Sequence, residues 1–540
     1  ALPPEIGQLT TLTYLDLQGN PLPILPELLG NPKNPQGILA FLSQQGKERM
    51  RPLCEAKMLL VGQGFAGKTS LRRSLMGEAV NPDELKTDGI EINEWRISLS
   101  GDAIKVNVWD FGGQEVMHAT HQFFLTERSL YLLVLNARQN ETENRLEFWL
   151  KMIQTFGGNA SVLVVINKSE EHSLLLDQDG LQRKYPNIKG FFHTAACPKA
   201  PQRQQGIDEL RQAIYREIDA LENLRYPLPA SCFAVKEHLE TMHRDYISMD
   251  EYKSLCHAKE VPDTIISTLL DLLHQLGIAL NYEQHKRYDI ADTSVLNPEW
   301  VTQGVYRILN YLPKIAQKPA ILTLDLLPQL LDPHHYPEAK YPFLLGMMEQ
   351  FEICYCMDGE KRSEFLFPDM LPPSEPDTGD WGEKLMFEYH YDVWIPSIMT
   401  RFIVRMSRYI SQNTVWRKGV LLRYEGMRAV VKVDPEEKQL VIWIEGLSSR
   451  RREFLAIIRN EFDVIHNSFE DLRYTEQVPI PDNPNSYVGY RHLLKLEKLR
   501  EETYIPEGME TKINVRELLN GLVSQEERYR DGLQGRENKM

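Results

Sequence analysis

A glycine-rich segment, Gly62–Thr69, has the residue types and spacing that hold phosphate groups. It reads GQGFAGKT, follows the apolar run Met58–Val61 and precedes a predicted helix over Lys68–Met76. In a P-loop of this kind the backbone N–H groups surround the phosphates, the lysine reaches the outer ones, and the next hydroxyl binds Mg²⁺. The predicted phosphate-binding residues are Gly62, Gln63, Gly64, Phe65, Ala66, Gly67, Lys68, Thr69 and Ser70.

A second motif, Asp110–Gln114 (DFGGQ), follows a predicted strand with alternating apolar residues over Ile104–Val108. At the end of such a strand, Asp110 can hold the water shell of Mg²⁺, and the Gly113 N–H can sense the outermost phosphate. Gln114 stands where a glutamine can orient the water that attacks this phosphate. The motif therefore predicts a metal-binding aspartate and a catalytic glutamine.

A third motif, Asn167–Glu170 (NKSE), follows the apolar run Val162–Ile166 and resembles the base-reading motif NKxD. Asn167 and Lys168 are predicted to support the loop and the base, and the acid to bond the N1 and N2 hydrogens of guanine. Because Glu170 is one methylene longer than the usual aspartate, we expect guanine preference to survive but to weaken. The three motifs in this order predict a small G domain that binds GTP and GDP, whereas a P-loop alone would leave ATP open.

Two further nucleotide contacts are predicted in loops. The backbone N–H of Cys197, in Ala196-Cys197-Pro198, is placed where it can meet guanine O6. Thr87 is the predicted switch I threonine that reaches the metal and the γ-phosphate, and the alternative is an ordinary loop threonine. The predicted Mg²⁺ ligands are then Thr69, Thr87 and Asp110.

Buried strands that alternate with helices are predicted around these motifs. Leu130–Leu135 and Val162–Ile166 are continuous apolar runs, which is typical of parallel strands covered on both sides. A helical stripe of apolar residues over Ile207–Leu221 closes the domain. The predicted fold class is an α/β G domain over residues 55–222, a P-loop NTPase with a doubly wound, mostly parallel sheet.

The first residues carry a different pattern, LxxLxLxxNxL, over Leu12–Leu22. It predicts that residues 1–35 are the end of a leucine-rich-repeat solenoid, against the alternative of a chance leucine pattern. Because isolated repeats cannot bury their leucines, we expect this segment to pack on the next part of the chain and the array to begin before Ala1. Residues 36–54 are predicted to form a linker with a short helix, Gln36–Gln45.

Residues 223–380 are predicted to be mostly helical, and residues 381–540 to combine an antiparallel sheet with helices. The helical signal covers Val235–Leu280, and Ala291–Leu312 pairs a short strand with a helix. The proline-rich passage Pro368–Trp381 separates the two parts. In the last part the predicted strands are Val420–Tyr424, Arg428–Val433 and Leu440–Ile444, and the predicted helices are Phe454–Phe462 and Tyr490–Arg500.

The composition is that of an ordinary globular protein, with a net charge of −15. This charge argues against unspecific binding to nucleic acids or anionic membranes. The chain has no apolar run of about 18 residues, so no membrane span is expected. Its six cysteines lack CxxC spacing, which favours reduced thiols and a cytoplasmic location.

Taken together, these segments resemble the Roco family, in which leucine-rich repeats precede a Roc G domain and a two-part α+β COR domain. The most specific stretch is Asp110–Thr126 (DFGGQEVMHATHQFFLT), which is similar to switch II of bacterial Roco proteins. Asn297–Trp300 (NPEW), Val305–Ile308 (VYRI) and Tyr504–Gly508 (YIPEG) resemble segments of COR. The resemblance covers essentially the whole chain.

The resemblance implies slow GTP hydrolysis and a homodimer formed through COR, with turnover and conformation coupled to dimerisation. It also implies a catalytic arginine near the dimer interface, and Arg138 occupies the matching stretch. The alternative for Arg138 is a solvated arginine that caps a strand. His118 and His121 are interpreted as packing or switch residues rather than metal ligands, and Arg450–Arg452 as a solvated helix start.

These patterns support three hypotheses of function. The leading one is a GTPase switch controlled by dimerisation. The second is a nucleotide-gated scaffold, in which the repeats bind an unknown protein partner and GTP is held with little or no hydrolysis. The third, an ATP-driven P-loop machine, is disfavoured by Asn167-Lys168. The sequence does not combine the Gly-rich loop, HRD motif and DFG motif of a protein kinase. Its one candidate for the last of these, Asp110-Phe111-Gly112, belongs to the G domain.

Overall fold

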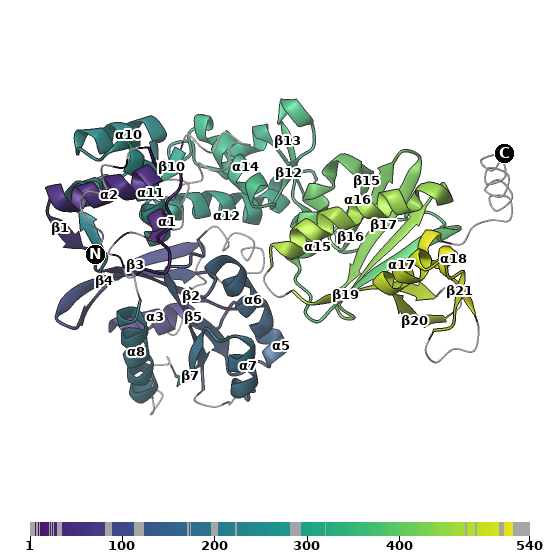
Figure 1. Cartoon of the computed structure of the whole chain (residues 1–540), viewed down its shortest axis with the longest axis horizontal. Coiled ribbons are helices and arrows are strands. Elements are labelled where there is room, and N and C mark those ends of the chain that lie inside the picture. Colours follow the sequence, from purple (N-terminus) through teal and green to yellow (C-terminus); the bar gives the residue numbers. More distant parts are fainter. Residues whose placement is uncertain are drawn as a thin grey trace. The chain divides into compact units, whose positions relative to one another are not determined.

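The structure is a computed structural model, and the chain divides into two compact units. The first unit comprises Ala1–Asn310 and Pro328–Phe351, and the second comprises Tyr311–Leu327 and Glu352–Met540. Figure 1 shows the helices and strands of both units with their labels. The structure describes residues 6, 9, 11–20, 22, 24, 26–29, 35–81, 89–112, 124–169, 172, 174–195, 203–221, 224–280, 293–318, 320–469, 472–480, 483–506 and 512–521.

The first unit contains a six-stranded sheet in the order β3-β4-β2-β5-β6-β7. The strands from β4 to β7 in this order are parallel, and β3 pairs antiparallel with β4, so that Ile90 lies opposite Phe111. The predicted strands around the three motifs and the mostly parallel sheet are confirmed. The strands are β2 (Glu55–Val61), β3 (Ile90–Leu99), β4 (Asp102–Phe111), β5 (Ser129–Asn136), β6 (Val162–Asn167) and β7 (Ile188–Thr194).

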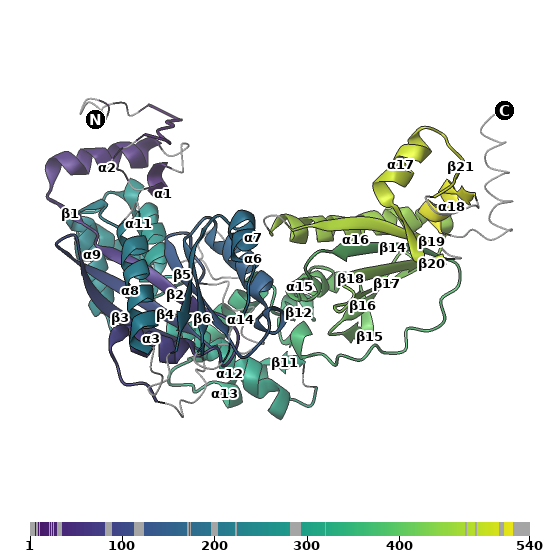
Figure 2. The ribbon, with the colours of Figure 1, turned by 90° about the horizontal axis from the view of Figure 1, so that it is seen from below.

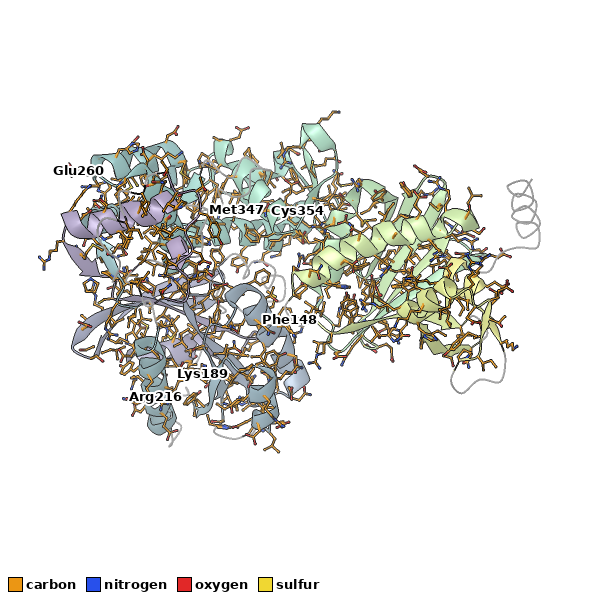
Figure 3. All side chains as sticks on the ribbon, in the orientation of Figure 1. Phe148, Lys189, Arg216, Glu260, Met347 and Cys354 are labelled. Atoms are coloured by element: carbon orange, nitrogen blue, oxygen red, sulfur yellow. The ribbon has the colours of Figure 1, made fainter. Side chains whose placement is uncertain are left out.

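Helices cover both faces of this sheet (Figure 2). Apolar side chains of α3 and α8 share one core with Met58, Leu60 and neighbouring strand residues, which confirms the predicted stripe; Leu221 lies just after the end of α8. Figure 3 shows the side chains between helices and sheet, with Phe148 labelled on α6 and Arg216 on α8. The helices are α3 (Lys68–Met76), α5 (Glu141–Asn144), α6 (Leu146–Gly157), α7 (Gln178–Lys184) and α8 (Arg203–Asp219).

A helical layer comes next in the chain, as predicted. Its helix α11 lies against β2 on the face of the sheet opposite to α3, where a Cβ at Gly277 would lie 2.3 Å from the Trp109 ring. The helices of this layer in the first unit are α9 (Ala230–Thr241), α10 (Met249–Ala258), α11 (Asp263–Leu276), α12 (Pro298–Ile315), α13 (Leu327–Leu330) and α14 (Tyr341–Gln350), of which α12 and α13 reach into the second unit. Two short antiparallel pairs accompany them, β1 (Met50–Pro52) with β8 (Pro227–Pro229) and β9 (Tyr246–Ser248) with β10 (Thr293–Val295).

The described part of residues 1–35 contains the short helix α1 (Pro26–Leu29) and no strand. The predicted linker helix is present as α2 (Pro35–Lys47). Leu15, Leu17 and Leu22 pack against the apolar core that α2 shares with the helical layer. The segment therefore packs on later parts of the chain, and the leucine-rich-repeat solenoid itself stays a prediction.

The second unit is built on a seven-stranded antiparallel sheet in the order β15-β16-β17-β18-β14-β19-β20. The predicted meander is confirmed as β16, β17 and β18. The strands are β14 (Lys384–Tyr391), β15 (Ile410–Trp416), β16 (Gly419–Tyr424), β17 (Met427–Asp434), β18 (Gln439–Glu445), β19 (Tyr474–Ile480) and β20 (Asn483–Gly489). The helices are α15 (Ser397–Arg405), α16 (Ser448–Asn467), α17 (Tyr490–Lys498) and α18 (Val515–Asn520).

Two smaller sheets complete the second unit. The first is three-stranded, with β13 between the other two, and the second is a two-stranded pair. Their strands are β11 (Ile321–Thr323), β12 (Tyr355–Cys356), β13 (Glu364–Leu366), β21 (Thr503–Tyr504) and β22 (Ile513–Asn514).

The interpretation of Arg450–Arg452 as a solvated helix start needs one correction. These residues do lie in the first turns of α16, but the Arg451 side chain is buried. Its guanidinium donates hydrogen bonds to the Gly446 carbonyl at 2.9 Å and the Asn520 carbonyl at 3.3 Å. Arg451 therefore joins α16 to the end of α18, because it lies on the face of α16 that packs inward.

Candidate functional site

The predicted phosphate-binding loop joins β2 to α3, and two of its glycines have conformations that other residues rarely adopt. Gly62 has a φ of +138°, and a Cβ there would lie 2.2 Å from the Val134 carbonyl oxygen. Gly67 has a φ of +86°, and a Cβ there would lie 2.5 Å from Asn167 Nδ2. The loop therefore lies directly against β5 and the end of β6, and a side chain at either glycine would push it away.

Lys68 is the first residue of α3, and its side chain lies against this loop. Its side chain is 6% exposed, and Nζ donates hydrogen bonds to the carbonyl oxygens of Gly62 at 2.8 Å and Gln63 at 2.9 Å. Burial lowers the pKa of Lys68 to about 8, and the Asp110 carboxylate acts in the opposite direction. At neutral pH the ammonium is thus mostly charged and faces the space that the loop encloses.

Asp110 lies near the end of β4 and is fully buried. Arg72 Nε lies 3.5 Å from one carboxylate oxygen, and within the described part of the chain neither oxygen has a hydrogen-bond partner of good geometry. Burial raises the pKa of Asp110 to about 6, while the Thr69 hydroxyl, Lys68 and Arg72 act to lower it. The carboxylate is therefore held next to the phosphate-binding loop with lone pairs to spare.

These residues fit a Mg²⁺ ion. Magnesium takes oxygen ligands and keeps several from water or phosphate, so one carboxylate and one hydroxyl from the protein suffice. Asp110 supplies a buried carboxylate with unused lone pairs, and the neighbouring Thr69 supplies a hydroxyl. The predicted third protein ligand, Thr87, lies outside the described residues.

Arg72 is a site residue that the motifs did not predict. It is buried on α3, one turn after Lys68, and its guanidinium reaches Asp110, Glu91 at 3.2 Å and Glu78 at 3.4 Å. An arginine one turn into the helix, facing the same way as the P-loop lysine, is the signal that could have identified it. Arg72 links the phosphate-binding helix to the start of β3.

Two residues of the NKSE motif contact the phosphate-binding loop. Asn167 Nδ2 donates a hydrogen bond to the Ala66 carbonyl at 2.9 Å, and Lys168 Nζ donates one to the Phe65 carbonyl at 2.6 Å. The Thr194 hydroxyl, at the end of β7, donates to Asn167 Oδ1 at 3.1 Å, and this support was not predicted. The structure thus brings Asn167 and Lys168 onto the phosphate-binding loop from a distant part of the chain.

Arg138 lies in the turn that follows β5 and is exposed. Its backbone N–H donates a hydrogen bond to Asn136 Oδ1 at 3.1 Å. The turn is held by Asn144, a buried residue of α5 whose Nδ2 donates to the carbonyls of Asn136 at 3.1 Å and Gln139 at 3.1 Å. The turn that presents Arg138 is therefore fixed by side-chain hydrogen bonds.

Several predicted site residues lie outside the described part of the structure. They are Thr87, Gly113, Gln114, Glu170 and Cys197, together with His118 and His121.

Lys57 is a second buried cation that the motifs did not predict. It lies on β2, and Nζ donates a hydrogen bond to the Phe124 carbonyl at 2.6 Å and lies 4.3 Å from the centre of the Trp109 ring. Burial lowers the pKa of Lys57 to about 7. Lys57 therefore attaches Phe124, five residues before the start of β5, to β2.

Comparison with known protein families gives three matches in chain order. The model described as Ras of Complex, Roc, domain of DAPkinase matches residues 57–170. The models described as C-terminal of Roc, COR-A domain and COR-B domain match residues 229–371 and 382–521. The Roc match contains the phosphate-binding loop and the other two motifs.

Curated relatives match most of this chain. The probable serine/threonine-protein kinase pats1 of Dictyostelium discoideum is 25% identical over 524 residues, which cover 87% of this chain and 16% of the relative. The Roc-COR-CHAT protease of Runella zeae is 25% identical over 475 residues, which cover 82% of this chain and 50% of the relative. The chain thus spans half or less of the length of these relatives.

A solved structure is also similar. The structure of Methanosarcina barkeri Roco2 RocCORdC bound to GDP is 39% identical, covers 60% of this chain and 98% of that chain, and superposes with a TM-score of 0.53. Among the helices that the structure describes, none is long and apolar enough to cross a membrane.

Proposed function

This chain belongs to the Roco family, with a Roc G domain followed by COR domains, and we propose that it is a molecular switch that binds GTP and hydrolyses it to GDP and phosphate. The observation that carries this proposal is the contact of Asn167 and Lys168 with the phosphate-binding loop. A P-loop alone would suit ATP equally well, whereas a motif predicted to read guanine supports binding of a guanine nucleotide.

The proposed mechanism combines the described phosphate-binding loop with the residues predicted from the three motifs. Backbone N–H groups of 62–69 and the start of α3 bind the phosphates, and Lys68 turns from its carbonyl partners to the β- and γ-phosphates. Gln114 orients the attacking water, and the Gly113 N–H contacts the γ-phosphate. Mg²⁺ held by Asp110, Thr69 and Thr87 would offset the charge of the phosphate oxygens.

The base is proposed to be read by the loops after β6 and β7. Glu170 would accept the guanine N1 and N2 hydrogens, and the Cys197 N–H would donate to guanine O6. Asn167 supports these contacts by joining the base-reading loop to the phosphate-binding loop.

We further infer that the chain forms a homodimer through COR and that Arg138 contributes to hydrolysis near that interface. A guanidinium can offset the charge that builds on the transferring phosphoryl group, an effect of about 10³–10⁵ where such arginines are established. The exposed position of Arg138 supports this role. We also propose that residues 1–35 are leucine-rich repeats that bind a protein partner. Residues 55–222 would then form the Roc domain, and residues 223–380 and 381–540 the two parts of COR. The proposed location is cytoplasmic.

Replacing Gln114 by leucine is expected to lower single-turnover GTP hydrolysis about 100-fold while leaving GTP affinity within about threefold, because leucine cannot orient the water. Hydrolysis is measured by phosphate release and affinity with a fluorescent GTP analogue. A Gln178→Leu variant, at an exposed position of α7, serves as the control. Hydrolysis that is unchanged in Gln114→Leu would support the scaffold with little turnover instead.

The mass of the chain in solution is expected to depend on the bound nucleotide, because dimerisation through COR is proposed to be coupled to the G domain. Light scattering of the nucleotide-free, GDP-bound and GTP-analogue forms measures this. GTP turnover per molecule should rise with protein concentration, because more of the chain is then dimeric. In Arg138→Ala, turnover per molecule should no longer depend on protein concentration. One unchanged mass in all three forms would contradict the coupling.

A further inference from the structure

The segment Asn297–Trp300 (NPEW) lies against the edge strand of the G-domain sheet. Glu299, in the first turn of α12, accepts a hydrogen bond from the Ile92 N–H at 3.0 Å. Ile92 lies on β3, which is the last strand on its side of the sheet, so this N–H points away from β4. Glu299 therefore supplies a partner to a strand edge that would otherwise be open.

Two turns further along α12, Tyr306 packs against the start of the same strand. The Tyr306 side chain is buried, and a Cβ at Gly89 would lie 3.2 Å from two carbons of its ring. Gly89 has a φ of +98°, so both the space and the backbone conformation favour glycine there. The ring thus rests directly on the backbone of Gly89.

Gly89 also joins the start of β3 to the end of β4, in a contact called here the Gly89–Gly112 joint. Its carbonyl accepts a hydrogen bond from the Gly112 N–H at 2.8 Å. In the sequence, Thr87 lies two residues before Gly89, and Gly112 directly precedes Gly113. Arg72 connects this joint to the phosphate-binding site, because its guanidinium contacts both Glu91 on β3 and Asp110 on β4.

The start of α12 is firmly attached to the rest of the helical layer. The Asn297 side chain accepts a hydrogen bond from the Glu299 N–H at 3.1 Å and donates one to Asp245 at 2.9 Å. Trp300 Nε1 donates to the His335 carbonyl at 2.8 Å, and the Tyr336 hydroxyl donates to the Trp300 carbonyl at 2.8 Å. A helix held in this way can act as a fixed reference for the strand that it touches.

We propose that Glu299 and Tyr306 are positioning residues that hold the Gly89–Gly112 joint in the arrangement that GTP, but not GDP, requires. This inference rests on the proposed function. Only GTP has the γ-phosphate that Thr87 and Gly113 are proposed to contact, and binding costs less when the ends of their loops are already in place. The same contacts make α12 the element of COR-A through which the nucleotide state is transmitted.

The test compares affinities for a fluorescent GDP and a fluorescent non-hydrolysable GTP analogue, with Mg²⁺, on the full chain. Tyr306→Ala and Glu299→Ala are expected to weaken binding of the analogue about 2- to 30-fold, with GDP binding changed less than about twofold. Tyr306→Phe keeps the ring and Glu299→Gln keeps an acceptor oxygen, so both should retain nearly the wild-type ratio. Tyr311→Ala removes an aromatic ring that is 52% exposed on the same helix and is the matched control.

The outcomes separate this inference from the proposed function. If the unaltered chain binds guanine nucleotides but the ratio of the two affinities is unchanged in both alanine variants, Glu299 and Tyr306 do not position the joint. An equal loss of both nucleotides, or a loss as large in Glu299→Gln as in Glu299→Ala, also overturns the inference. If Tyr306→Ala does not fold, the Glu299 pair decides. A chain that binds neither guanine nucleotide overturns the proposed function itself.

Discussion

Replacing Lys68 by alanine is expected to weaken binding of both GTP and GDP by at least about 100-fold. Truncating one partner of a buried, hydrogen-bonded charge pair costs about 2–5 kcal/mol, and every 1.4 kcal/mol is a factor of ten in affinity. Lys68 is 6% exposed and is already directed into the loop by the carbonyls of Gly62 and Gln63. The guanidinium of Arg72, one turn further along α3, is engaged with Glu91 and Glu78 and so does not substitute for this charge.

Titration with fluorescent GDP and GTP analogues measures this loss, and circular dichroism establishes that the variant is folded. The matched control is Lys184→Ala. Lys184 lies on α7 of the same domain, 42% of its side chain is exposed, and its ammonium lies 2.8 Å from Glu147. This variant should bind like the unaltered chain. If a folded Lys68→Ala chain retained its affinity, the assignment of the phosphate site would be wrong.

Replacing Asn167 by alanine is expected to weaken GTP and GDP about 10- to 100-fold and to reduce the preference for GTP over ATP. The substitution leaves the Ala66 carbonyl and the Thr194 hydroxyl without their buried partner, and each such loss costs about 1–3 kcal/mol. The phosphate-binding loop and the base-reading loop would then lose the side chain that joins them. Stability should fall as well, because both orphaned groups are buried.

Competition of GTP and ATP against a fluorescent GDP measures the affinity and the preference in one experiment. Asn187→Ala is the control, since Asn187 Nδ2 donates one hydrogen bond to the Ala160 carbonyl at 3.1 Å in the same domain, away from the site. Affinities that are unchanged in Asn167→Ala would show that this contact does not support nucleotide binding. Tighter ATP than GTP binding by the unaltered chain would favour an ATP-driven machine.

The phosphate-binding core could be predicted from the sequence because each of its motifs is local. The glycine-rich loop and its lysine follow strand β2, and the aspartate at 110 lies at the end of strand β4. The carboxyl ends of neighbouring parallel strands meet at one edge of a sheet, so motifs that follow such strands come together without further information. The same locality predicted α3, the mostly parallel sheet and the meander β16–β18.

The remaining contacts were decided only by the tertiary structure. Nothing in the pattern around Arg72 shows that it joins Glu91 to Asp110, and a run of three arginines does not show that Arg451 is the buried one. The motif NPEW was recognisable, but its contact with β3 depends on how α12 packs against a strand more than two hundred residues earlier. Such contacts follow from the packing of whole elements, which local residue preferences do not encode. The sequence by itself therefore predicted where the nucleotide should bind, and only the folded chain showed that residues of COR-A touch β3 and the Gly89–Gly112 joint.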